Sequence, residues 1–229
     1  EKALAAAADA VIVDLEDAVP PERKRQARAV ARGAIAAAHG SREGTLVVIR
    51  VNDLSTGLAE DDIAETFACA PDAYMIPKVQ TSEEVHTLSR VLDIREKNAG
   101  LGLGVTRLIP IVTETPAPIF RLPELCGCDP RIAAILWGTE DLGAAIGARR
   151  VKRDDGVMLD VFRTVRSLAL LAGSAAGIGI IDTPVIDFSD DEGLQRESLE
   201  ASRMGFTGKL AIHPRQVPII NAAFLPDAS

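Results

Sequence analysis

Two acidic residues stand where apolar segments of the chain end. Glu114 comes just after the apolar run at residues 108–112, and Asp141 comes just after the run at residues 133–137. Their spacing suits a strand–helix–strand unit, which would place both carboxylates at the same end of neighbouring parallel strands. Carboxylate oxygens without a histidine are typical ligands of Mg²⁺, and Mn²⁺ accepts similar ligands. The pair therefore predicts a Mg²⁺ or Mn²⁺ site, with helix capping as the alternative role for either residue.

Further polar side chains follow the other apolar segments, and they include one well-placed arginine, Arg50. Such an acid-rich site suits a metal that binds an anionic 2-oxo or 2-hydroxy acid, with the arginine stabilising a developing enolate. The remaining members of this set are Asp14, Glu16, Asp17, Asn52, Lys78, Thr139, Glu140, Asp182, Asp187 and His213.

Seven apolar segments alternate with helix-forming segments and predict the strands that position these side chains. The segments are wholly apolar, which is typical of a parallel sheet covered on both faces. The pattern favours an α/β fold, a TIM (β/α)₈ barrel, over an open doubly wound sheet, because charged residues cluster at the carboxyl ends of the strands. The predicted strands are Val11–Leu15, Thr45–Val51, Ala73–Ile76, Leu108–Val112, Ala133–Trp137, Gly177–Ile181 and Lys209–Ile212.

A barrel of this kind needs eight strands, and the expected position of the eighth is upstream of Glu1. We therefore expect a single barrel domain over residues 1–229 that lacks its first strand. The consequence would be an open seam between the strands Val11–Leu15 and Lys209–Ile212, with unpaired edges that another segment or a partner covers.

Composition narrows the classes of protein to which the chain can belong. The 229 residues are 47% hydrophobic, enough for one sizeable core, and the net charge of −8 argues against nucleic acid or an anionic membrane as a partner. The cysteines Cys69, Cys126 and Cys128 are too few for a disulfide framework or a zinc site. The most apolar run, Ser167–Ile181, is too short to cross a bilayer. These features predict a cytoplasmic protein without a membrane or nucleic-acid partner.

Six motifs occur along the chain in this order: DLEDAVPPERKRQAR, VIRVN, MIPKV, TETP, GTEDLGAAIG and MGFTGKLAIHPRQ. They make the chain similar to the citrate lyase β-subunit family of the HpcH/HpaI aldolase superfamily, which includes malyl-CoA and citramalyl-CoA lyases. The resemblance covers nearly the whole chain. It implies a TIM barrel, a homo-oligomer (a trimer or a hexamer), and a Mg²⁺-dependent lyase that cleaves or forms carbon–carbon bonds in 3-hydroxyacyl thioesters. The partner would be an acyl-CoA or acyl-carrier-protein thioester such as a citryl, citramalyl or malyl thioester.

The resemblance also implies roles for individual residues. It assigns Glu114 and Asp141 as the metal ligands, and it makes Glu114 a substrate contact as well. It makes Arg50, in VIRVN, a substrate-binding and catalytic arginine, and Lys2 matches a position that binds CoA in family members. Several members also carry a C-terminal lid that supplies an acid/base aspartate, and this sequence stops at Ser229, which leaves the general acid/base unassigned.

Three further residues near the predicted metal receive roles from their chemistry. Glu16 and Asp17 are expected to be catalytic residues that hydrogen-bond metal-bound water, with capping of the following helix as the alternative. Lys78 is expected to contact a substrate carboxylate or the thioester, with a surface charge as the alternative.

Two other functions stay open at this point. An aldolase acting on free 2-oxo acids would need a basic residue, commonly a histidine, near the metal, and His39 and His86 lie in predicted helices. A non-catalytic subunit that retains the fold is the second alternative. The intact set of Arg50, Glu114 and Asp141 favours the lyase over such a subunit.

Overall fold

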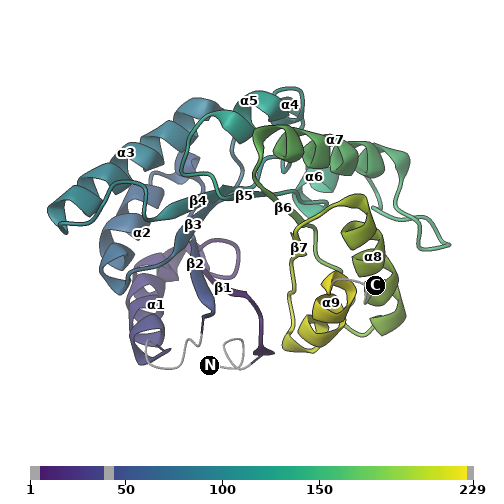
Figure 1. Ribbon diagram of the computed structural model, residues 1–229, viewed down its shortest axis with the longest axis horizontal. Helices are drawn as coiled ribbons and strands as arrows, with labels where there is room; N and C mark the ends of the chain where they lie inside the picture. Colours follow the sequence, from purple (N-terminus) through teal and green to yellow (C-terminus); the bar gives the residue numbers. More distant parts are fainter. Residues whose placement is uncertain (1–5, 39–43, 226–229) are drawn as a thin grey trace.

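The computed structural model describes residues 6–38 and 44–225, which contain two parallel sheets, of four and three strands, that follow one curve (Figure 1). Each strand pairs with its neighbour in the sequence, and backbone bridges from Leu108 to Ile132 and from Ile111 to Leu136 join the fourth strand to the fifth. The strands are β1 (Ala10–Asp14), β2 (Leu46–Arg50), β3 (Ala73–Ile76), β4 (Arg107–Pro110), β5 (Ala134–Leu136), β6 (Gly179–Asp182) and β7 (Gly208–Lys209).

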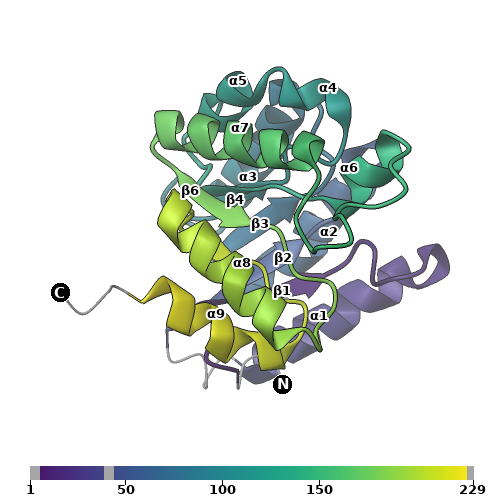
Figure 2. The ribbon, with the colours of Figure 1, turned by 90° about the vertical axis from the view of Figure 1, so that its right-hand side faces the viewer.

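Helices alternate with the strands and lie on the outer side of the curved sheet (Figure 1). Figure 2 looks onto the side covered by α7, α8 and α9. The α-helices are α1 (Lys24–Ala38), α2 (Ala59–Thr66), α3 (Ser82–Asn98), α4 (Pro116–Ile119), α5 (Leu122–Gly127), α6 (Glu140–Ala145), α7 (Asp160–Ala176), α8 (Asp191–Met204) and α9 (Val217–Phe224). Short 3₁₀ helices are η2 (Pro21–Arg23), η3 (Leu54–Thr56), η4 (Phe67–Cys69) and η5 (Pro214–Gln216).

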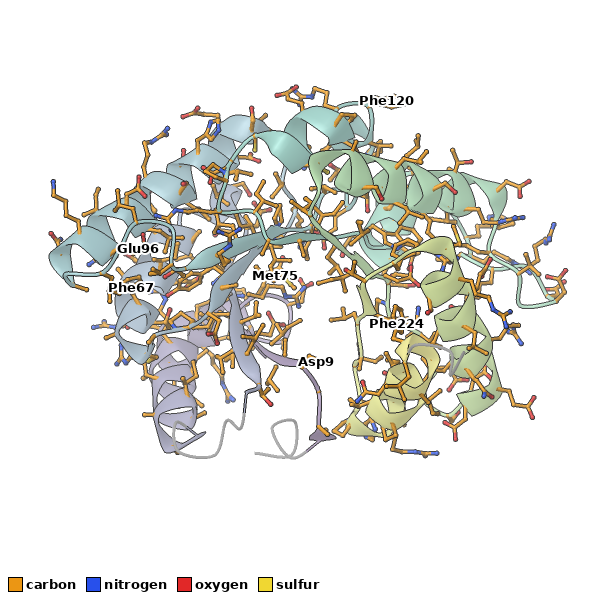
Figure 3. All side chains as sticks on the ribbon, viewed as in Figure 1. Asp9, Phe67, Met75, Glu96, Phe120 and Phe224 are labelled. Carbon is orange, nitrogen blue, oxygen red and sulfur yellow. The ribbon has the colours of Figure 1, made fainter. Side chains whose placement is uncertain are left out.

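The core of the described residues has two main parts, one on each face of the curved sheet, and a third small cluster of Val185, Leu194 and Ile220. The larger part lies between strands and helices and includes the fully buried Trp137, Tyr74 and Phe162. A smaller cluster on the other face contains Ile109 and Met75, the second of which is labelled in Figure 3. Burial on both faces is why the strand segments are wholly apolar, as predicted for a covered parallel sheet. Within the described residues no helix is both long and apolar enough to span a membrane.

Local sequence signals place several element ends, and side-chain hydrogen bonds explain where the prediction of the last strand differs. Thr81 begins α3 through the capping box with Glu84 that the sequence predicted. The last strand is shorter than the predicted Lys209–Ile212, because the Gln216 side chain accepts hydrogen bonds from the backbone N–H groups of Ile212 and His213. That side chain replaces the neighbouring strand as the backbone's partner.

The α/β fold with a parallel sheet is confirmed, and β1 and β7 are its two edges. Among the residues described, no backbone hydrogen bond joins β1 to β7, which agrees with the expected open seam. A cavity of about 750 Å³ lies between these edges, with Asp9 and Phe224 on its two sides (Figure 3). The eighth strand and the closure of the barrel stay predictions.

Two helical glycines, Gly173 in α7 and Gly33 in α1, should respond in opposite ways when alanine replaces them. A Cβ added at Gly173 would lie 2.4 Å from Cγ1 of the buried Ile180. We expect Gly173→Ala to lower the free energy of unfolding, because overpacking costs about 1–3 kcal/mol and helix propensity returns only about 1 kcal/mol. At Gly33 in α1 an added Cβ meets nothing within 4 Å, so Gly33→Ala should stabilise by about 0.5–1 kcal/mol. Urea unfolding of both variants checks this, and equal shifts of the same sign would contradict it.

Candidate active site

The predicted metal ligands lie where β4 and β5 lead into their helices. Glu114 follows β4, is only 5% exposed, and interacts electrostatically with Asp141 and Glu16. Asp141 lies in the first turn of α6 and is half-buried. Burial, with the charges of these two neighbouring carboxylates, raises the pKa of Glu114 to about 8. The strand ends therefore bring the two carboxylates close enough to influence each other, as the spacing predicted.

Lys78 connects Glu114 to the loop that follows β1. Its backbone has φ of 53°, a left-handed conformation that costs a non-glycine residue about 1–2 kcal/mol. In this conformation its N–H donates to Oε2 of Glu114 (2.5 Å), and its Nζ donates to Oε1 of Glu16 (2.5 Å). Burial acts to lower the pKa of Lys78, but the Glu16 and Asp17 carboxylates outweigh it and raise that pKa. Lys78 thus contacts the acidic cluster rather than lying as an isolated surface charge.

The guanidinium of Arg50 is held by Asp14, its direct partner in the pairing of β1 with β2. Nε donates to Oδ1 of Asp14 (2.8 Å) and Nη2 donates to Oδ2 (2.6 Å). The backbone N–H groups of Glu16 and Ala18 fix the Asp14 carboxylate in turn. Burial acts to raise the pKa of Asp14, but the Arg50 contacts outweigh it and lower that pKa. This two-bond arrangement leaves Nη1 of Arg50 directed at the neighbouring carboxylates.

The third nitrogen of Arg50, Nη1, lies close to the carboxylates of Glu16 and Asp17. Nη1 of Arg50 lies 3.0 Å from Oε2 of Glu16 and 3.4 Å from Oδ2 of Asp17. Glu16 is 5% exposed, and burial raises its pKa. Its Oε2 is buried and accepts no hydrogen bond of acceptable geometry among the described residues, although Arg50 is near. A buried acceptor with spare capacity points to a ligand or water as its missing partner.

Taken together, five carboxyl groups surround two cations, which leaves an excess of negative charge suited to a divalent cation. The acids are Asp14, Glu16, Asp17, Glu114 and Asp141, and the cations are Arg50 and Lys78. In residues 6–38 and 44–225, no three His, Cys, Asp or Glu side chains converge as a complete metal cage. A site made of only two carboxylates does not meet this three-residue criterion. Mg²⁺ commonly binds to one or two carboxylates together with water or substrate oxygens.

The structure separates other strand-end residues from this cluster. Asp182 is turned into a buried network, where it accepts hydrogen bonds from Trp137, Arg166 and Lys209. His213 caps η5 and stacks on Phe188. Lys2, the expected CoA contact, lies outside the described residues.

Asn52 and Asp187 do not join the acidic cluster either. The Asn52 side chain donates a hydrogen bond to the buried Asp62, and Asp187 accepts one from Ser189. Asp14 is the residue whose role the sequence left unassigned. The signal that would have found it is the strand register, because aligning DLED with VIRVN in neighbouring parallel strands pairs Asp14 with Arg50.

Comparison with known proteins gives a consistent result. A family model described as HpcH/HpaI aldolase/citrate lyase matches residues 1–214. The citrate lyase subunit beta-like protein of Mycobacterium tuberculosis is 33% identical over 222 residues, covering 97% of this chain and 73% of that protein. The mitochondrial citramalyl-CoA lyase of Rattus norvegicus is 34% identical over 229 residues, covering 95% of this chain and 65% of that protein.

A solved structure is similar over the same extent. The crystal structure of the protein CitE from M. tuberculosis, in complex with magnesium and acetoacetate, superposes with a TM-score of 0.80 and 33% sequence identity. The match covers 97% of this chain and 84% of that one. These two relatives are thus a lyase and a lyase-subunit-like protein, and the related structure holds magnesium.

Proposed function

Because the chain belongs to the HpcH/HpaI aldolase/citrate lyase family, we propose that it is a Mg²⁺-dependent carbon–carbon lyase acting on a 3-hydroxyacyl thioester. The substrate class is that of citryl-, citramalyl- and malyl-CoA or the corresponding acyl-carrier-protein thioesters, and the products are a 2-oxo acid and an acyl thioester. The observation that carries this proposal is the acidic cluster in which Arg50, fixed by Asp14, faces the carboxylates beside Glu114 and Asp141. A closed barrel, a homotrimer or hexamer, and a cytoplasmic location are further predictions.

The residues of the site fit a divalent cation. Glu114 and Asp141 would hold the Mg²⁺, which supplies positive charge that polarises a substrate oxygen. The buried Oε2 of Glu16, which accepts no hydrogen bond from the described residues, supports this fit, since it can accept one from bound water or substrate. The raised pKa of Glu114 supports it too, because a buried carboxyl beside two other acids gains from a neutralising cation.

The chain's own side chains would then act on the substrate as follows. Arg50 stabilises the negative charge that develops on oxygen as the carbon–carbon bond breaks, a contribution typically worth ~3 kcal/mol for one donor. Asp14 and the backbone N–H groups that bind it keep the guanidinium oriented. Glu16 presents its buried Oε2 as an acceptor for a hydrogen bond from substrate or water. Lys78 keeps Glu16 and Glu114 in fixed relative positions through its two hydrogen bonds.

The two alternative functions have less support. For an aldolase on free 2-oxo acids, a histidine should approach the acidic cluster, yet Nε2 of His86 bonds the carbonyl of Cys128 and His213 caps η5. His39 lies outside the described residues. A non-catalytic subunit would have no need to keep a two-bond Asp14–Arg50 contact at the strand ends.

A panel of thioesters tests the proposal. Citryl-, citramalyl- and malyl-CoA are incubated with the protein, with and without Mg²⁺, and both the 2-oxo acid and free CoA are measured. A lyase releases the 2-oxo acid without free CoA, and only when metal is present. Hydrolysis of the thioester alone releases CoA without the 2-oxo acid, and cleavage confined to free 4-hydroxy-2-oxo acids would favour the aldolase instead.

The raised pKa of Glu114 predicts a pH-dependent affinity for the metal. With a pKa of about 8, this carboxyl is protonated in the metal-free protein below that pH, so Mg²⁺ must displace the proton. Apparent affinity should therefore rise by up to about tenfold per pH unit as the pH increases towards 8, and then level off. Calorimetry at pH 6.5, in buffers of different ionisation enthalpy, measures the proton released.

The raised pKa of Glu114 also predicts how the stability of the metal-free protein changes with pH, and this dependence gives a control. A carboxyl whose folded-state pKa is raised stabilises the metal-free fold below the unfolded value near 4.5, and that contribution is lost as pH rises through about 8. Glu114→Gln should flatten this decline between pH 5 and 8, as measured by thermal unfolding in EDTA. Metal binding at pH 6.5 without proton release would contradict the assignment of Glu114.

A further inference from the structure

A second cavity lies in the outer helical layer, between α7, α8 and the segment 152–158. Its volume is about 500 Å³, and Figure 2 looks onto this side of the molecule. It is separate from the acidic cluster, whose residues follow β1 to β5. Five basic side chains line the cavity against three acidic ones, although the whole protein carries a net charge of −8. The basic residues are Lys152, Arg163, Arg166, Arg196 and Arg203.

The acids of this α7–α8 cavity are already neutralised by contacts within the protein. Glu197 pairs with Lys152, and Glu200 pairs with Nη1 of Arg166 at 3.2 Å. Asp182 is buried and accepts hydrogen bonds from both Arg166 and Lys209. These contacts form the floor of the cavity, and they leave no acidic group of the lining free to satisfy the other arginines.

Three arginines of the lining keep unused hydrogen-bonding capacity. The side chains of Arg196 and Arg203 form no hydrogen bond or ion pair with any residue the structure describes. The nearest acid to Arg163 is Asp160, at 3.8 Å and 89% exposed in its side chain, an ion pair of little strength. Arg203 follows Arg196 by two helical turns, about 10.5 Å along α8.

The segment 152–158 shapes the wall opposite α8. A bridge between Lys152 and Met158 closes this segment into a loop, and Gly156 adopts φ of +78° within it. A Cβ at Gly156 would lie 3.5 Å from Nη2 of Arg196, so the loop backbone approaches the guanidinium closely. Arg196 is exposed, and its guanidinium lies beside the loop at the cavity.

We propose that the α7–α8 cavity binds a small organic or inorganic polyanion that carries two or more phosphate or carboxylate groups, through Arg163, Arg196 and Arg203. Guanidinium groups form paired hydrogen bonds with either kind of group. The separation of Arg196 and Arg203 along α8 favours a ligand whose anionic groups are several ångströms apart over a single monoanion. The site is independent of the proposed lyase reaction and would be suited to a regulatory ligand.

The test uses the whole chain, stripped of metal ions and transferred to chelator-free buffer because EDTA is itself a polycarboxylate. No thioester is present, so the result does not depend on lyase activity. Inorganic pyrophosphate and tricarballylate are titrated separately by calorimetry at low salt, and the two arms distinguish phosphate from carboxylate recognition. We expect at least one of them to bind the unaltered protein. The variant R196Q/R203Q should weaken that binding about tenfold or more, the effect of losing one charge-assisted hydrogen bond.

A charge-matched variant supplies the control. R90Q/R95Q removes two arginines from α3, which lies at the left of Figure 1, whereas α7 and α8 lie at the right; it should leave the affinity unchanged within about twofold. Thermal unfolding of both double variants verifies that they are folded. Failure of both anions to bind the unaltered protein, or equal affinities of the unaltered protein and R196Q/R203Q, would overturn the proposal.

Discussion

Asp141→Asn is expected to weaken the binding of Mg²⁺ by more than about a hundredfold. Asparagine keeps the shape of the side chain but removes one of the two charges that would neutralise the cation, and even residues outside the ligand set typically cost ~10–100-fold. The remaining proposed ligand, Glu114, is buried and would be the one carboxylate left to hold the cation. Titration of Mg²⁺ and Mn²⁺ by calorimetry at pH 8 measures the loss.

Two aspartates serve as matched comparisons for this prediction. Asp17→Asn should be milder, about 10–100-fold, because Asp17 contacts Arg50 and Lys78 rather than serving as a proposed ligand. Asp187→Asn should have no effect, since Asp187 lies beyond β6 and contacts only its local turn. Wild-type metal affinity in Asp141→Asn would remove the basis of the proposed metal site.

Arg50→Lys should lower turnover of the thioester substrate by about a hundredfold or more while leaving Mg²⁺ affinity nearly unchanged. The substitution keeps the positive charge but cannot reproduce the two parallel hydrogen bonds to Asp14 or place a second nitrogen towards the reacting oxygen. Loss of one donor to a developing oxyanion typically costs ~10²–10³ in kcat. Steady-state kinetics with the active thioester, together with a metal titration, separates the two effects.

The matched control is Arg32→Lys, a partly exposed arginine of α1 that contacts Glu65 away from the acidic cluster. It should have wild-type kinetics. Asp14→Asn should share part of the Arg50→Lys loss, because it weakens the contact that orients the guanidinium, and the two losses should be less than additive when combined. Full turnover in Arg50→Lys, or an equal loss in Arg32→Lys, would exclude the role assigned to Arg50.

The sequence by itself determined the features that depend on short windows of residues. Wholly apolar segments specified a parallel sheet covered on both faces, and the Thr81–Glu84 pair specified the start of α3. Because parallel strands share one carboxyl edge, the positions of Glu114 and Asp141 at strand ends also specified that the two carboxylates would be neighbours. Local periodicity and capping are properties of adjacent residues, so they can be read without the fold.

The tertiary structure decided which of the strand-end side chains belong to the site. The register of β1 with β2 pairs Asp14 with Arg50, and Asp14 accepts two hydrogen bonds from the Arg50 guanidinium. The left-handed backbone of Lys78 directs its N–H at Glu114. Asp182, at an equivalent strand end, is turned away into a buried network with Arg166 and Lys209. Side-chain direction, burial and backbone strain depend on partners that lie far away in the sequence, and such contacts are fixed only when the chain is packed.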